Sequence, residues 1–283
     1  MKLEGRRTSD NVDDRRRSGK TTATLGIGGL IVVGIITWLM GGNPLDVITN
    51  QLANVMQTGT EHEPSAREDS MAVFASTILA GTEDVWTKEF EKMGRKYTPP
   101  KMVLFPGSTR SGCGNASSQT GPFYCPTDQT LYIDLSFFDQ MSNQLGAGGD
   151  FAYAYVIAHE VGHHVQNLLG TIDKVNQMQS RANKKESNQL SVRLELQADF
   201  YAGIWAYYDN KMYKSLEEGD IEKGLNAASA IGDDRLQMQS QGYTVPDAFN
   251  HGTSEQRVRW LKKGATSGRI ADGDTFSPDY SSL

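Results

Sequence analysis

The spacing of apolar residues along the chain predicts several helices and a few short strands. Apolar residues recur three to four positions apart over residues 71–97, where Gly81–Asp84 separates two predicted helices. Further helices are predicted in four later stretches, at residues 151–164, 193–208, 221–231 and 253–261. Strands are predicted where β-forming residues gather, at residues 101–105 and 130–138. This order favours one α+β domain over residues 71–270, mainly helical with a small sheet.

Residues 22–42 stand apart because they carry no charge over 21 positions. A helix needs about 20 apolar residues to cross a bilayer, and Trp38 lies near the far end, where interfacial aromatic residues gather. The stretch is longer than the core of a signal peptide, and no A-x-A-like cleavage site follows it. A buried core helix is less favoured, because the flanks show no amphipathic alternation. We therefore predict one transmembrane helix at residues 22–42, which anchors the chain in the cell membrane.

Charge predicts the orientation of this anchor. Residues 1–21 hold seven Lys/Arg against four Asp/Glu, whereas the whole chain has a net charge of −6. By the positive-inside rule, residues 1–21 form a cytoplasmic basic tail and the acidic body is periplasmic or extracellular. Acidic residues are interleaved with the arginines, so a nucleic-acid partner is not expected. The polar residues 43–70 predict a linker or stalk, in which His62 is solvated, and residues 271–283 predict an irregular tail.

The chain has only two cysteines, Cys113 and Cys125, in a loop rich in Gly and Ser. Free buried thiols or a pair of metal ligands are alternatives, although the spacing is not that of a C-x-x-C motif. Outside the cytoplasm, two such cysteines favour a disulfide.

The strongest chemical pattern is His159-Glu160-Val161-Gly162-His163, an H-E-x-x-H motif inside an apolar predicted helix. Residues four apart lie on one face of a helix, so His159 and His163 can bind one metal ion. Imidazole and carboxylate ligands suit zinc. Glu160 is then placed to act as general base for a water molecule. The alternative is a surface helix that carries these residues by chance. It is not favoured, because three of the five histidines of the chain fall at positions 159, 163 and 164.

A third zinc ligand is predicted at Glu195, in a second stretch with helical spacing. Asp199 lies four positions later on the same face, where it can accept a hydrogen bond from the far nitrogen of a ligand histidine. The small residues Ala202 and Gly203 are expected to let this helix approach the first one closely. A solvated Glu/Asp pair is the alternative, but the apolar surroundings predict burial, and a buried carboxylate needs a partner.

His251 precedes a helix that begins at a capping box formed by Thr253 and Gln256. It could donate a hydrogen bond to the oxyanion of a reacting substrate, or it could simply pack at the start of the helix. Because His164 is rotated about 100° from His163 on the same helix, it is a poor candidate for this role. We predict that His251 faces the metal site.

The chain resembles the bacterial membrane-anchored "putative neutral zinc metallopeptidase" family. The resemblance extends over nearly the whole chain, and six segments carry it: Glu4–Val12, Gly121–Pro126, Tyr132–Phe138, His159–His163, Glu195–Asp199 and His251–Arg257. The last is far more specific than H-E-x-x-H alone. Family membership implies a zincin-like fold and a peptidase activity, without a defined substrate. Where the family often has a further cysteine near the C-terminus, this chain has Gly273.

Together these patterns predict a zinc metalloendopeptidase of the gluzincin type, with one Zn²⁺ per chain and a peptide or protein as substrate. Two other functions fit the same residues. A zinc amidase could cleave cell-wall peptides, because the same chemistry hydrolyses any amide. A non-catalytic adaptor could keep zinc for structure, although a structural zinc site usually has four protein ligands and only three are identified. A strand at residues 130–138 could also bind an extended substrate at its edge, or be internal to the sheet.

Overall fold

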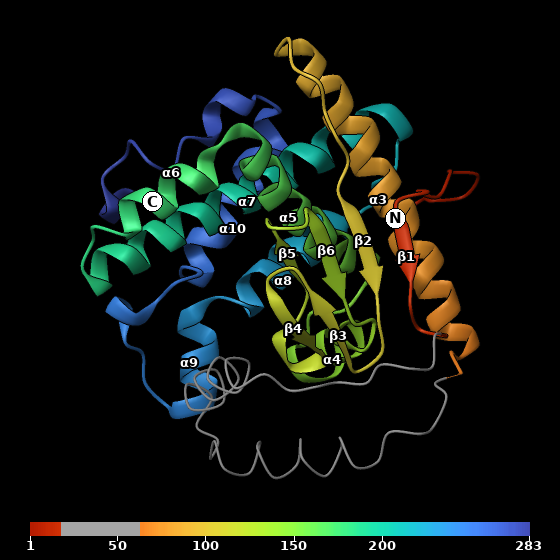
Figure 1. Ribbon diagram of the computed structural model, residues 1–283, viewed down its shortest axis with the longest axis horizontal. Coiled ribbons are helices and arrows are strands. Elements are labelled where there is room, and N and C mark those ends of the chain that lie inside the picture. Colours follow the sequence, from red (N-terminus) through yellow and green to blue (C-terminus); the bar gives the residue numbers. More distant parts are fainter. Residues whose placement is uncertain (18–62) are drawn as a thin grey trace.

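The computed structural model describes residues 1–17 and 63–283, in which eight α-helices surround a small sheet (Figure 1). The predicted α+β architecture, mainly helical, is confirmed for these residues. The helices are α3 (Ala66–Lys92), α4 (Ser136–Leu145), α5 (Asp150–Leu169), α6 (Thr171–Gln179), α7 (Lys184–Tyr213), α8 (Asp220–Ala230), α9 (Asp233–Gln241) and α10 (Ser254–Ser267).

The main sheet has four strands in the order β1-β2-β6-β5, and a separate hairpin pairs β3 with β4. β1 and β6 both run parallel to β2, whereas β5 is antiparallel to β6. The strands are β1 (Val12–Asp14), β2 (Lys101–Leu104), β3 (Ser108–Ser111), β4 (Gly114–Ser117), β5 (Phe123–Cys125) and β6 (Thr130–Ile133). β6 is therefore internal, and a substrate cannot pair with it. Among the described residues no strand pairs with the other edge of β5, which packs against α5 (Asp150–Leu169).

Two predicted boundaries differ from the structure. The predicted strand at residues 130–138 ends at Ile133, and α4 begins at Ser136. Asp134 explains the change of direction, because its carboxylate accepts hydrogen bonds from the backbone N–H groups of Ser136 (3.0 Å) and Gly107 (2.9 Å). The predicted break at Gly81–Asp84 is wrong, since α3 is continuous through these residues.

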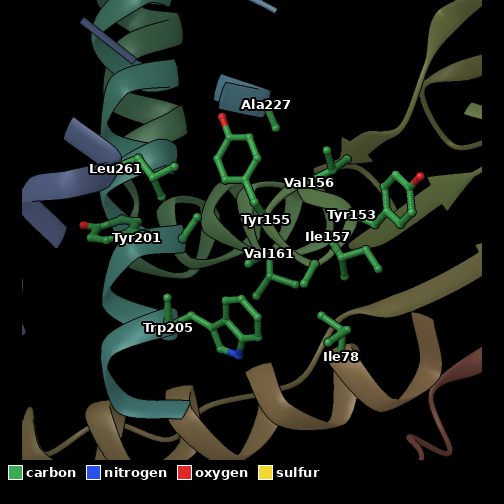
Figure 2. Close-up of a cluster of buried hydrophobic side chains, with 14 of the residues drawn as sticks. Ile78, Tyr153, Tyr155, Val156, Ile157, Val161, Tyr201, Trp205, Ala227 and Leu261 are labelled. Atoms are coloured by element: carbon green, nitrogen blue, oxygen red, sulfur yellow. The ribbon is translucent and has the colours of Figure 1, made fainter. Parts of the chain in front are cut away.

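α5 lies at the centre of the molecule, between the sheet and helices α7 and α10 (Figure 1). A helix that is apolar on all sides is expected to be buried, and α5 is buried over most of its length. Figure 2 shows Tyr155 extending from α5 beside Ala227 of α8, while Trp205 of α7 lies on the opposite side, toward Ile78 of α3. This packing holds the H-E-x-x-H segment inside the core.

Glycines set the distances between the central helices, but not at the position predicted. A Cβ atom at Gly162 of α5 would lie 2.9 Å from the carbonyl oxygen of Ala198, so α5 and α7 meet there. Gly203 instead faces α10, where a Cβ atom would lie 2.3 Å from the carbonyl oxygen of Leu261. The prediction that Gly203 brings α7 close to α5 is therefore wrong, and Gly162 has that role.

The folded body is larger than the predicted domain at residues 71–270. Residues 1–17, predicted to be a separate tail, pack against it, and β1 extends the main sheet. α3 begins at Ala66, inside the predicted linker. At the other end, the predicted irregular tail is packed too, with Thr275 and Leu283 buried. The predicted transmembrane helix at residues 22–42 lies outside the described residues, and no helix within the described ranges is long and apolar enough to cross a bilayer.

The structure contains the Cys113–Cys125 disulfide. Cys113 lies in the turn of the β3–β4 hairpin, and Cys125 ends the edge strand β5. The bond therefore ties the hairpin to the strand that lies beside α5. Closing a loop of this size stabilises a fold by about 3 kcal/mol in the chain-entropy model.

Candidate metal centre

Three side chains from two helices converge on one point. His159 and His163 come from α5, and Glu195 comes from α7. The Glu195 carboxylate oxygens lie 3.1 Å from Nε2 of His159 and 3.5 Å from Nε2 of His163. One ligand atom from each residue falls within 4.8 Å of the others, and no second group of this kind exists in the part of the chain that the structure describes. The predicted ligand set is thus brought together.

The far nitrogen of each histidine is held by a hydrogen-bond acceptor. Nδ1 of His159 lies 2.8 Å from Oδ1 of Asp199, the partner predicted for a ligand histidine. Nδ1 of His163 lies 2.9 Å from Oε1 of Gln166. Since each Nδ1 donates its proton to an oxygen, the Nε2 atom on the side of Glu195 is the one that would bind a metal ion once its own proton is lost. Two imidazole nitrogens and one carboxylate form a donor set that fits zinc and leaves a coordination position for a reactant.

Asp199 is itself fixed by a buried network. It has no exposed surface, and Arg257 of α10 donates to both of its oxygens, with Nε at 2.9 Å and Nη2 at 3.0 Å. The hydroxyl of Tyr155 donates a third hydrogen bond, at 2.6 Å. A chain of contacts therefore runs from α10 through Asp199 to His159, and it places the ring of the ligand histidine.

Burial and charge act in opposite directions on the acidic and basic groups of the site. Burial disfavours the charged form of His159, but Asp199 and Glu195 outweigh it and raise the pKa of His159 to about 10. Burial also opposes ionisation of Glu195, yet the positive charge on His163 and a hydrogen bond from His159 hold its pKa well below the usual range. The site therefore attracts a positive charge to the point between these side chains, where a metal cation would replace the protons.

Glu160 lies beside this point but is not one of the converging ligands. It is buried, and burial raises the pKa of its carboxyl group, whereas the nearby charges of His163 and His159 lower it. The backbone N–H of Tyr124, in β5, lies near this carboxylate and contributes to lowering its pKa. The free edge of β5 therefore faces Glu160, the residue predicted to be the general base.

His164, whose direction on the helix made it a poor candidate for the oxyanion role, has a structural role. Its Nε2 lies 2.7 Å from the carbonyl oxygen of Thr98, so Nε2 carries the proton. Its Nδ1 then accepts a hydrogen bond from the hydroxyl of Tyr124, at 3.0 Å. Burial lowers the pKa of His164 to about 4, which keeps the ring neutral. Through Tyr124, this histidine fixes β5 against α5.

His251 is close enough to the site for its charge to interact with Glu195. Its side chain is 51% exposed, and its charge contributes to the low pKa of Glu195. Nδ1 of His251 lies 3.2 Å from Oδ1 of Asp233. The other oxygen of Asp233 accepts hydrogen bonds from the backbone N–H groups of Asn250, His251 and Gly252, at 2.8, 2.7 and 3.0 Å. Asp233 thus fixes both the turn and the ring, and the Nε2 atom of His251 stays available to a reactant.

Comparison with known proteins agrees with this site. The family described as "Putative neutral zinc metallopeptidase" matches residues 1–276, and the chain belongs to this family. Its members are zinc peptidases by that description, and the family resemblance seen in the sequence is confirmed.

Relatives of the chain include two proteins whose names assign no activity. "Uncharacterized protein YpfJ" of Escherichia coli strain K12 is 51% identical over 286 residues, which cover 98% of this chain and 99% of that protein. "Uncharacterized protein Rv2575" of Mycobacterium tuberculosis strain H37Rv is 46% identical over 191 residues, 64% of each chain. No solved structure matches the chain significantly.

Four residues of the site were not singled out by sequence reasoning: Tyr155, Gln166, Asp233 and Arg257. Arg257 and Gln166 had weak signals. Arg257 ends one of the segments of the family resemblance, and Gln166 follows His163 by three positions, which places both on one helix face. Tyr155 had the same kind of signal, because it precedes His159 by four positions on the same helix, whereas Asp233 had none because His251 is 18 positions away.

Proposed function

We propose that the chain is a zinc-dependent endopeptidase in which His159, His163 and Glu195 hold one Zn²⁺. The convergence of these three ligand atoms within 4.8 Å carries the proposal. When bound, zinc acts as a Lewis acid that polarises the scissile carbonyl and makes water a nucleophile near neutral pH. No fourth His, Cys, Asp or Glu joins this group in the described ranges, which favours catalysis over a purely structural zinc site.

Glu160 serves as the general base. Its carboxylate takes a proton from the attacking water and passes that proton to the nitrogen of the leaving amine. Burial of the carboxyl group raises its pKa, which makes the carboxylate a stronger base than an exposed one. The nearby backbone N–H of Tyr124 favours the charged carboxylate, the form that accepts the proton.

The edge of β5 is the proposed substrate-binding strand. The backbone N–H of Tyr124 is directed to Glu160, and the prolines at positions 122 and 126 have no N–H group. Backbone groups of alternate residues face the same edge, so β5 offers mainly carbonyl oxygens there. An extended substrate would therefore bind by donating its own backbone N–H groups, as in strand addition.

The function is tested with the purified full-length chain and a denatured protein substrate. We expect about one zinc per chain, hydrolysis that stops on treatment with a chelator, and recovery when zinc is restored. Purified peptidoglycan is the second arm, and cleavage of its peptides alone would favour the amidase. A peptide with N-methylated backbone positions should be cleaved less well than its parent. Absence of cleavage in both arms by the zinc-loaded protein would contradict the proposal.

His251 is proposed to donate a hydrogen bond to the carbonyl oxygen as it becomes negative. Loss of one such donor commonly lowers kcat on the order of a hundredfold or more. We therefore expect His251→Ala to bind zinc normally, with KM little changed and kcat reduced by about that factor. His251→Gln, which keeps a donor, should retain more activity. An unchanged kcat in the alanine variant would remove His251 from the mechanism.

A further inference from the structure

The first residues of the chain form part of the main sheet. β1 pairs in parallel with β2, with Val12 opposite Met102 and Asp14 opposite Leu104. Backbone hydrogen bonds extend this pairing at both ends, from the N–H of Met102 to the carbonyl of Asn11 and from the N–H of Arg15 to the carbonyl of Leu104, each 2.8 Å. Figure 1 shows β1 beside β2, at the edge of the sheet opposite β5.

A buried ion pair fixes the same segment to the helix that carries Glu195. Nη2 and Nη1 of Arg6 lie 2.6 and 3.0 Å from the two carboxylate oxygens of Asp209 in α7. The side chains of Arg6 and Asp209 are only 8% and 1% exposed. Gly81 in α3 leaves room for this pair, because a Cβ atom there would lie 2.5 Å from Nη2 of Arg6. Arg6, Gly81 and Asp209 therefore pack closely together, although they come from three distant parts of the chain.

A second anchor surrounds Glu83, a buried carboxylate of α3. The hydroxyl of Ser9 and the side-chain amide of Asn11 both donate hydrogen bonds to Oε1 of Glu83. Arg7 adds an ion pair to Oε2, at 2.9 Å. The backbone N–H of Ser9 also donates to the carbonyl oxygen of Ser76, at 3.1 Å. These contacts are those of a fold interior rather than of a loosely attached tail.

The arginines that predicted a cytoplasmic tail are paired with carboxylates of α3. Arg7 lies 2.6 Å from Asp84, and Arg16 and Arg17 lie 3.1 and 2.7 Å from the two oxygens of Asp69. Arg16 is also almost fully buried. The positive charge at the start of the chain therefore neutralises acidic groups of the domain. Because pairing with these carboxylates accounts for the arginines, their number does not indicate on which side of a membrane residues 1–17 lie.

We propose that residues 1–17 are a permanent part of the catalytic domain and share its compartment. Residue 17 and residue 63 then lie on the same side of any membrane. A single crossing at residues 22–42 would place β1 and β2 on opposite faces of the bilayer and separate Arg6 from Asp209. Any contact of residues 22–42 with a membrane is therefore made from the side of the domain.

Thiol labelling in intact cells tests this topology. The parent has only the two disulfide-bonded cysteines, so Asp10→Cys in the N-terminal segment and Lys262→Cys in α10 each introduce one free thiol at an exposed position. Full-length variants are treated with a membrane-impermeant maleimide before and after permeabilisation. We expect both thiols to be labelled under the same condition. If one is labelled in intact cells and the other only after permeabilisation, the proposal is wrong.

A double-mutant cycle on the purified full-length protein tests the docking itself. Arg6→Met and Asp209→Asn are each expected to lower the unfolding temperature, because each leaves a buried partner unpaired. The double variant should lose clearly less than the sum of the two single losses, because it leaves neither partner buried without the other. Fully additive losses, or an Arg6→Met variant as stable as the parent, would show that the segment does not dock. Neither experiment measures catalysis, so both are independent of the proposed peptidase activity.

Discussion

Glu160→Gln should bind zinc like the parent and lose hydrolysis by on the order of 10²–10⁴-fold in kcat, the usual contribution of a general base. Glutamine matches the shape of glutamate, and it removes a carboxylate whose charge is disfavoured by burial. The variant should therefore fold at least as well as the parent. The three ligands are untouched, so the zinc content should not change.

Zinc content per chain and steady-state hydrolysis of a denatured protein measure the two parts of this expectation. His163→Ala is the matched control, since it removes a ligand from the same helix and should lose zinc and hydrolysis together. Glu160→Gln should lose hydrolysis and keep zinc, whereas His163→Ala should lose both. This difference would distinguish the general base from a zinc ligand. If Glu160→Gln cleaved as fast as the parent, Glu160 would not be the base.

The parts of the site that were predicted from sequence depend on local geometry. Two histidines four apart, and Glu195 four before Asp199, share a helix face whatever the rest of the fold does. The start of α10 was predictable for the same reason, because the capping box of Thr253 is formed within one turn.

What could not be predicted depends on how distant segments meet. The small residue that brings α5 and α7 together is Gly162, and no sequence pattern distinguishes it from Gly203. The order of the strands makes β5 the free edge, although β6 has the stronger strand pattern. Asp233 and His251 are 18 positions apart, and only the fold makes them partners.

The N-terminal segment illustrates a different limit. A cluster of arginines next to an apolar stretch predicts a membrane topology when only local composition is known. The same arginines can pair with carboxylates far along the chain, and the structure contains those pairs with α3 and α7. Charge composition alone cannot distinguish the two, because the acidic partners are separated from the arginines by more than 50 positions.

The second large effect is expected from Arg257, which lies outside the ligand set. Asp199 is fully buried, and although burial opposes its ionisation, Arg257 is the strongest influence that holds its pKa below the usual range. Arg257→Met would leave a buried carboxylate without its cation, which typically costs 3–5 kcal/mol, so we expect a loss of about that size in the free energy of unfolding. Asp199→Asn combined with Arg257→Met should be less destabilised than Arg257→Met alone.

Zinc affinity should fall with the same substitution, because Asp199 places the ring of His159. Loss of groups that orient a metal ligand typically lowers affinity by about 10- to 100-fold. Competition with a chelator, at a temperature where both proteins are folded, measures the change. Arg16→Met is the matched control, since Arg16 is also buried and paired with aspartates but lies away from the site. It should lower stability and leave zinc affinity unchanged. Equal zinc affinity in Arg257→Met and the parent would show that Asp199 holds His159 without help from α10.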